Sequence, residues 1–231
     1  MNPQGIVLLY VFPSMDASSD YARGLAARIH AAAAPGTTVR VATVAGAPAH
    51  LETFYNRAHL VPRLLQTVAD SHEPFQALIV GCFTDPGVDA LREVVSVPVI
   101  GIGEASMYVA CGLGYRFSVV IAGDKYAAAT ARQVRLLGLD SRLASVEVVA
   151  VNVLDLRKGG EREKAAVVEA CRRAARNGAD AIVMGCGTLG RYARHVQAAW
   201  GKPVVDPVTA GVKLAEVLAF HAVVPTAAGV V

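Results

Sequence analysis

Short apolar runs alternate with amphipathic, alanine-rich stretches along nearly the whole chain. The apolar runs are rich in Val, Ile and Leu, which is the pattern of strands that are covered on both faces of a sheet. They predict strands near residues 5–11, 38–44, 77–82, 97–102, 116–122, 146–152, 180–186 and 203–205.

The stretches between these runs space their apolar residues as one face of a helix does. They predict helices at about residues 18–34, 50–70, 86–95, 124–137, 161–176, 189–199 and 207–221. Parallel strands need crossover connections, which are usually helical, so this alternation predicts an α/β fold with parallel sheets.

The same succession of segments occurs twice. The sequence ALIVGC at Ala77–Cys82 returns as AIVMGC at Ala181–Cys186, and the runs before and after each copy also correspond. The offset is far longer than the ~20–50 residues of solenoid repeats, so it indicates two duplicated halves. We predict two pseudosymmetric lobes, each a parallel four-stranded sheet flanked by helices. Residues 1–98 form lobe 1, which the C-terminal helix 207–231 completes, and residues 99–206 form lobe 2.

The net charge and the hydropathy of the chain limit the classes of partner that we expect. The chain has 231 residues and a formal net charge of +3, and its Lys and Arg are scattered, so it lacks the basic stripe of nucleic-acid binders. Charges or prolines interrupt every apolar run before it reaches the ~18 residues of a membrane helix. The first fifteen residues lack the positive start of a signal peptide. We expect a cytoplasmic protein with a small-molecule substrate, and no nucleic-acid or membrane partner.

The four cysteines, at positions 82, 111, 171 and 186, show neither a C-x-x-C pair nor a zinc-type spacing. Reduced thiols and no metal site follow from this pattern. Cys171 shares a helix face with Val167 and Ala174, so we predict that it packs in the core, and Cys111 also fits a structural role. Cys82 and Cys186 differ from these two because each comes directly after a strand.

Ligands of open parallel sheets bind at the carboxyl ends of the strands, so both of these thiols are candidates for one site. After Cys82, Asp85 is predicted as the N-cap of the next helix and Pro86 as its first residue. After Cys186, Thr188 is predicted to cap the following helix. A helix N-terminus favours a thiolate and can hold a substrate oxyanion.

Two thiols on opposite sides of one carbon suit a specific reaction. One thiolate removes a proton and the other thiol returns a proton to the far face, which inverts the centre. If backbone N–H groups stabilise the enolate, no metal or organic cofactor is needed. The residues at strand ends that we predict to contact the substrate are Phe12, Ser14, Phe83, Thr84, Gly187 and Thr188.

The residues around Cys82 resemble a known family. The segment CFTDPGVDALRE at Cys82–Glu93 and the segment PVIGIGEAS at Pro98–Ser106 are similar to signatures of the aspartate/glutamate/hydantoin racemase superfamily, most of all its hydantoin and allantoin racemases. The resemblance covers nearly the whole chain. It implies cofactor-independent, two-base racemisation by Cys82 and Cys186, in a cleft between the lobes of a homo-oligomer. The implied substrate is a small cyclic ureide, a 5-substituted hydantoin or allantoin.

Three turns depart from the family pattern. The first strand ends in Phe12-Pro13-Ser14 where relatives commonly have an N-P-N-type turn, and Ala122-Gly123 stands where relatives often have Thr. The second cysteine precedes Gly187-Thr188-Leu189 instead of an A-G-M-type turn. Fewer polar groups at two of these places indicate a more apolar substrate.

Other functions remain open at this point. The segment Gly185–Gly190 satisfies G-x-G-x-x-G, with Asp206 near the spacing of a ribose-binding acid, although few residues follow and the repeat already explains Gly185-Cys186. An amino-acid (Asp/Glu-type) racemase and a related Cys-dependent isomerase or decarboxylase are further enzyme alternatives. A small-molecule binding or sensor protein is the non-enzymatic one.

Overall fold

A computed structural model describes residues 5–13, 19–48, 50–151 and 153–222 of the chain. The chain divides into two compact units: unit 1 comprises Met1–Ile102 with Gly211–Val231, and unit 2 comprises Gly103–Ala210. The end of the predicted segment 207–231, from residue 223 onward, lies outside the described residues.

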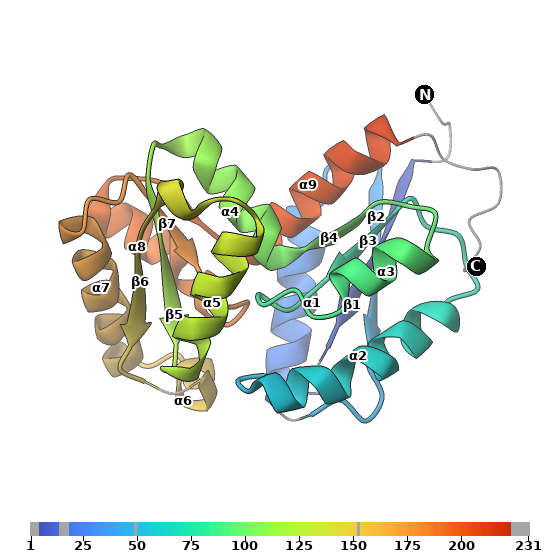
Figure 1. Cartoon of the computed structure of the whole chain (residues 1–231), viewed down its shortest axis with the longest axis horizontal. Helices are drawn as coiled ribbons and strands as arrows, with labels where there is room; N and C mark the ends of the chain where they lie inside the picture. The colour runs from blue at the N-terminus through green and yellow to red at the C-terminus, as the bar shows by residue number, and fades with distance from the viewer. Residues whose placement is uncertain (1–4, 14–18, 49, 152, 223–231) are drawn as a thin grey trace. The chain divides into compact units, whose positions relative to one another are not determined.

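Unit 1 is built on a four-stranded sheet with the order β2-β1-β3-β4, in which every pair of neighbours is parallel. Its strands are β1 (Ile6–Phe12), β2 (Thr37–Thr43), β3 (Ala77–Val80) and β4 (Val99–Gly101). Its helices are α1 (Asp20–Ala32), α2 (Phe54–Ala69), α3 (Val88–Val94) and most of α9 (Pro207–His221) (Figure 1).

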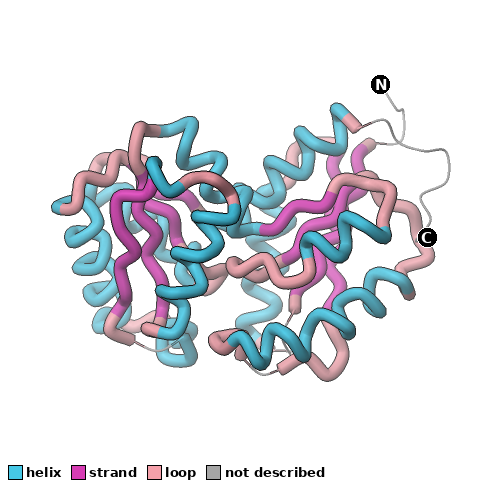
Figure 2. Tube along the Cα trace, viewed as in Figure 1, coloured by secondary structure: helices cyan, strands magenta, loops and turns pink. Residues whose placement is uncertain are grey.

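Unit 2 repeats this plan with the order β6-β5-β7-β8, again all parallel. Its strands are β5 (Phe117–Ala122), β6 (Leu143–Val149), β7 (Ala181–Met184) and β8 (Val204–Val205). Its helices are α4 (Ile102–Leu113), α5 (Lys125–Leu136), α6 (Val153–Lys158), α7 (Glu161–Arg176) and α8 (Ala193–Trp200), with short 3-10 turns at η1 (Asp140–Arg142) and η2 (Leu189–Tyr192). The predicted α/β class, with two parallel four-stranded sheets flanked by helices, is confirmed, as Figure 2 shows for each unit.

Each sheet is covered by helices because its strands carry apolar side chains on both faces. In unit 1, one face packs against α2 and α3 through a cluster that includes Leu9, Val11, Leu60, Leu64, Leu78, Val80 and Leu91. On the other face, α9 comes close enough at Gly211 that an added methyl group would lie 3.4 Å from Ile79 Cγ2. In unit 2, the matching cluster joins the sheet to α7 and α8 and includes Val120, Met184, Val167, Cys171, Ala174 and Val196. Burial of these side chains is the main stabilising term for both units.

Cys171 is 3% exposed within this second cluster, as its helical spacing predicts. Burial raises the pKa of its thiol to about 12, although Arg173 acts in the opposite direction. A thiol in this environment stays protonated and unreactive at neutral pH.

Several element boundaries differ from the predictions. The segments at α4 and α6 were not predicted as helices. The strand β6 begins and ends three residues earlier than the predicted strand 146–152. The helix predicted from residue 86 begins at Val88 instead, directly after Gly87, whose φ is 77°. Asp85 is therefore not its N-cap, and Pro86 is not its first residue. In the part of the chain that the structure describes, no helix is both long and apolar enough to cross a membrane.

Candidate active site

The strand order places a topological switch point in each unit. In unit 1, the chain leaves β1 for β2 on one side and later crosses to β3 on the other, and β5 with β7 repeats this arrangement in unit 2. Ligands of open α/β sheets bind outside the carboxyl ends of the strands at such a point. Phe12 ends β1 and Gly81-Cys82 follows β3, so both flank the switch point of unit 1.

A glycine before each cysteine is required by close packing. The Gly81 N–H donates to the carbonyl of Val11 at 2.9 Å, which extends the ladder between β1 and β3 by one residue. An added Cβ on Gly81 would lie 2.8 Å from Cζ and 2.9 Å from the hydroxyl of Tyr10, a fully buried side chain. Only glycine lets the chain pass Tyr10 and present Cys82 at the strand end.

The glycine before Cys186 in unit 2 is packed just as closely. The Gly185 N–H donates to the carbonyl of Val120 at 2.7 Å. A Cβ on Gly185 would lie 2.9 Å from that carbonyl oxygen and 2.5 Å from Ile121 Cγ2. The packing of the sheet thus requires a glycine before the cysteine in both units, and both cysteines are half-buried.

The first cysteine lies in a tight turn. Its carbonyl accepts the N–H of Asp85 at 3.0 Å, and its Sγ lies 3.5 Å from the hydroxyl of Thr84, where either atom can donate. Asp85 has a φ of 49°, in the left-handed region. The predicted contact residue Thr84 therefore lies directly beside the sulfur of Cys82.

The second cysteine lies in a different turn. Its Sγ accepts the backbone N–H of Thr188 at 3.4 Å, and its carbonyl accepts the N–H of Gly190 at 3.1 Å. Thr188 precedes the 3-10 turn η2, but its side chain makes no capping hydrogen bond there, so the predicted capping role is wrong. The backbone N–H of Thr188 therefore contacts the sulfur.

The other predicted contact residues fall at the same strand ends. Phe12 is 9% exposed, and its ring centroid lies 6.4 Å from that of Tyr21 on α1. Phe83 is 3% exposed, whereas Gly187 is half-buried. The predicted contact Ser14 lies outside the described residues.

The sequence analysis did not single out two buried polar side chains. Arg57, which is 7% exposed on α2, donates to the carbonyl of Leu51 at 3.2 Å. Tyr192, which is 3% exposed at the end of η2, donates to the carbonyl of Leu156 at 2.8 Å. Leu51 and Leu156 are both buried and occupy corresponding connections, β2 to α2 and β6 to α7. Arg57 and Tyr192 themselves lie on elements that do not correspond in the two units, so the repeat gives no signal for them.

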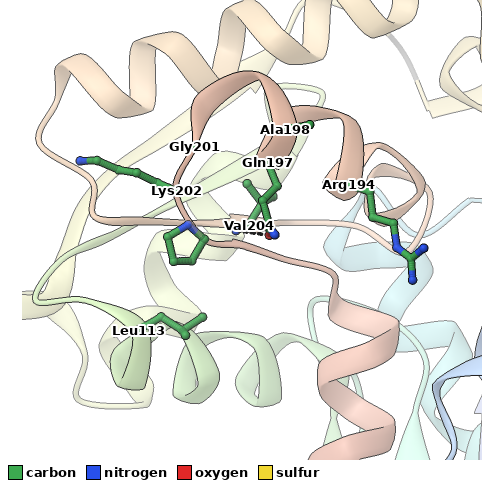
Figure 3. Close-up of a pocket in the computed structure, with 8 residues that line it drawn as sticks. Leu113, Arg194, Gln197, Ala198, Gly201, Lys202 and Val204 are labelled. Atoms are coloured by element: carbon green, nitrogen blue, oxygen red, sulfur yellow. Dashed lines mark hydrogen bonds between the residues drawn. The ribbon is translucent and has the colours of Figure 1, made fainter.

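A groove of about 880 Å³ in unit 2 does not belong to this site (Figure 3). Its lining residues are Leu113, Arg194, Gln197, Ala198, Gly201, Lys202, Pro203 and Val204. Leu113 comes just before β5 and Pro203 just before β8, so the groove lies at the amino-terminal edge of the sheet. Cys186 follows a strand and therefore lies at the opposite, carboxyl-terminal edge.

The described residues offer few other groups for metal binding or thiol chemistry. No group of three or more His, Cys, Asp or Glu side chains within the described ranges is arranged to hold a metal ion. Cys111 lies on α4, where partial burial raises the pKa of its thiol while Arg142 acts to lower it. Among the residues with described positions, Cys82 and Cys186 are thus the two whose thiols follow a strand at the switch point.

The fold agrees with comparisons to known proteins. Residues 9–215 match the family model described as Asp/Glu/Hydantoin racemase. The chain belongs to this family and is an isomerase of the racemase type.

Individual relatives lie on the hydantoin and allantoin side of the family. A hydantoin racemase from Pseudomonas sp. (strain NS671) is 32% identical over 177 residues, which cover 74% of this chain and 70% of the relative. The crystal structure of an allantoin racemase from Pseudomonas fluorescens has a TM-score of 0.87 and 30% identity, and covers 92% of this chain and 90% of that one. An allantoin racemase from Klebsiella pneumoniae has a TM-score of 0.86 and 28% identity, with 93% and 87% coverage.

Proposed function

We propose that the protein is a cofactor-independent racemase that inverts the stereocentre of a small cyclic ureide, a 5-substituted hydantoin or allantoin. Cys82 and Cys186 are the two bases. The observation that carries this proposal is that both units end an interior strand in Gly-Cys at the switch point, where the packing of the sheet requires the glycine.

The proposed reaction transfers one proton on each face of the substrate. Cys82, as a thiolate, takes the proton from the carbon, and the electron pair moves into the adjacent carbonyl to give an enolate. Cys186, as a thiol, then gives its proton to the opposite face. The cycle leaves Cys82 as thiol and Cys186 as thiolate, which is the state needed to process the other enantiomer.

The contacts around the sulfurs fit these roles. The N–H of Thr188 that points to the Sγ of Cys186 stabilises negative charge on that sulfur through a charge-assisted hydrogen bond. The Thr84 hydroxyl stands beside Cys82 and can donate or accept as its thiol changes protonation state. Backbone N–H groups at the strand ends stabilise the enolate, so the reaction needs no metal or organic cofactor.

The substrate class follows from the chemistry of the carbon acid and from the relatives. A hydantoin ring carries an amide carbonyl next to its stereocentre and has no carboxylate that would need an arginine clamp. The relatives are named hydantoin racemase and allantoin racemase. The apolar turn at Phe12-Pro13 favours a 5-substituted hydantoin with an apolar substituent. We further propose that the protein acts as a homo-oligomer.

The test uses single enantiomers in deuterium oxide. Optical rotation and the entry of solvent deuterium at the stereocentre are followed for several 5-substituted hydantoins, allantoin, aspartate and glutamate. We expect loss of rotation together with deuterium entry for at least one cyclic ureide, and no racemisation of it by Cys82→Ala or Cys186→Ala. Turnover of an amino acid alone would move the substrate to the Asp/Glu class. Racemisation by either variant would reject the two-base mechanism.

A further inference from the structure

The two units differ in how the helix after their last strand begins. α9 follows β8 directly, and Asp206 between them caps the helix. Its Oδ1 accepts the N–H of Val208 at 3.2 Å, and its Oδ2 accepts the hydroxyl of Thr209 at 2.9 Å. An acid directly before a helix commonly satisfies the first N–H groups in this way. In unit 1 the corresponding residue, which ends β4 directly before α4, is Gly101, which has no side chain.

A carboxyl group from another part of unit 1 lies against Gly101. An added methyl group on Gly101 would overlap Cγ and Oδ1 of Asp85 and would lie 2.6 Å from its Cβ. Only glycine at this position leaves room for the Asp85 side chain. The next residue, Ile102, is the first of α4, and negative charge is favoured at the start of a helix.

Asp85 reaches this position through an unfavourable backbone conformation. Within the described ranges it is the one non-glycine residue with a positive φ, at 49°. Such a conformation costs on the order of 1 kcal/mol and persists only when the surrounding structure holds it. The Asp85 N–H also donates to the carbonyl of Cys82, so the turn that is held at Gly101 is the turn that carries the thiol.

Unit 2 lacks this connection. The position that corresponds to Asp85 in the repeat is Leu189, which is fully buried in the hydrophobic cluster of that unit. The acid of unit 2 remains beside its own helix, at Asp206. The turn at Cys186 is therefore held by an apolar side chain, and the turn at Cys82 by a carboxylate.

We propose that Asp85 is a positioning residue for Cys82: its carboxylate, seated at Gly101 before α4, fixes the turn that presents the thiol. This inference rests on the proposed function, in which each thiol exchanges the proton on one face of the substrate. It makes the two bases unequal, because only Cys82 depends on a carboxylate. Loss of this contact slows proton transfer by Cys82 on one face of the substrate. Proton transfer by Cys186 on the other face is unaffected.

Four variants separate the effect of Asp85 on the position of Cys82 from its effect on the stability of the protein. Asp85→Gly removes the carboxyl group without backbone strain, because glycine adopts positive φ readily. Gly101→Ala keeps Asp85 and displaces its side chain. Asp85→Gly with Gly101→Asp gives α4 an adjacent acid, as α9 has in Asp206, but this acid does not hold the turn at Cys82. Asp89→Asn is the matched control, because the Asp89 side chain is 99% exposed on α3.

The main measurement is the rate of deuterium entry into each enantiomer separately, with Cys82→Ala and Cys186→Ala assigning a thiol to each face. We expect Asp85→Gly and Gly101→Ala to slow exchange on the Cys82 face on the order of 10- to 100-fold, the scale of a misplaced catalytic group. Exchange on the Cys186 face and the Asp89→Asn control should stay at wild-type rates. The double variant should regain melting temperature but not exchange. Equal slowing on both faces, unchanged rates, or recovery of exchange together with melting temperature would overturn the proposal.

A second readout does not require the racemase reaction. The resting protein is treated with iodoacetamide, and alkylation of each cysteine is followed by peptide mass spectrometry. We expect Cys82 to react several-fold faster in Asp85→Gly than in wild type, because its turn is no longer held, whereas Cys186 should react at the same rate in both. If no candidate substrate exchanges a proton with the wild type, the proposed function fails. An unchanged alkylation rate at Cys82 is the separate result that removes the role of Asp85.

Discussion

The phenolic hydroxyl of Tyr192 donates a hydrogen bond of 2.8 Å to the carbonyl oxygen of Leu156, and both residues are buried. Tyr192 ends the 3-10 turn that follows Cys186, and Leu156 lies on α6 in the connection from β6 to α7. This bond therefore joins the connections that follow β6 and β7, at the carboxyl-terminal edge of the sheet of unit 2. A second bond, from Arg191 Nη1 to the carbonyl of Arg157 at 2.8 Å, supports the same junction.

We predict that Tyr192→Phe destabilises unit 2. The variant keeps the ring and leaves the buried carbonyl of Leu156 without the hydroxyl donor, which costs about 1–3 kcal/mol. Urea unfolding monitored by circular dichroism measures the loss. Tyr115→Phe is the control, because Tyr115 is 87% exposed, and its free energy of unfolding should stay at the wild-type value. Equal stability of the two variants would contradict the role of the Tyr192 hydroxyl.

The C-terminal end of α4 depends on one arginine. Helix ends leave carbonyl groups without partners in the helix. Arg142 donates to the carbonyl of Cys111 in the last turn of α4 at 2.8 Å, and to those of Gly114 at 2.6 Å and Tyr115 at 2.5 Å just beyond the helix. Its positive charge is also favourable at this end of the helix.

We predict that Arg142→Met, which keeps much of the apolar stem, lowers the free energy of unfolding by about 1–3 kcal/mol. For a chain of this size, each kcal/mol corresponds to about 2–4 °C in melting temperature. Differential scanning calorimetry checks this shift. Arg132→Met on the neighbouring helix α5 is the control, and a shift as small as that of the control would show that solvent replaces the guanidinium at no cost.

The position of Cys82 and Cys186 directly after strands could be predicted because its signal is local and repeated. Each apolar run stops at Gly-Cys, and parallel strands with helical crossovers place such endings at one edge of a sheet. The helix at α4 could not be predicted from periodicity, because residues from Ile102 to Met107 are buried all round and leave no polar face. Asp85-Pro86 looked like a helix start because those residue types favour one. In the structure the Asp85 side chain instead lies against Gly101, which ends β4 and is not visible in the local sequence.

Acid stability should depend on Glu216. Partial burial raises the pKa of this carboxyl, but hydrogen bonds from the Ala34 N–H and the Lys213 ammonium outweigh burial, so its pKa lies below the ordinary value of 4.5. A lowered pKa in the folded state means that this stabilisation is complete above the ordinary pKa. It is lost as the pH falls through the folded value.

We therefore predict that the free energy of unfolding of wild type falls as the pH drops below about 4.5, and that Glu216→Gln shows a smaller fall. The variant is less stable than wild type at neutral pH, and the difference between the two narrows in acid. Urea titrations at a series of pH values give both curves. A constant difference across the series would mean that ionisation of Glu216 does not contribute to folding.

The four thiols should differ in reactivity according to their surroundings. Burial raises the pKa of Cys171 to about 12, so its thiolate is scarce at neutral pH and its sulfur is also shielded from reagents. Cys82 and Cys186 are half-buried at strand ends and have donors beside their sulfurs. We predict that iodoacetamide alkylates Cys82 and Cys186 in the folded protein and leaves Cys171 unmodified over the same period. In urea all four should react at similar rates, which makes the unfolded chain its own control. Modification of folded Cys171 as fast as Cys82 would show that α7 detaches from its sheet on the timescale of the reaction.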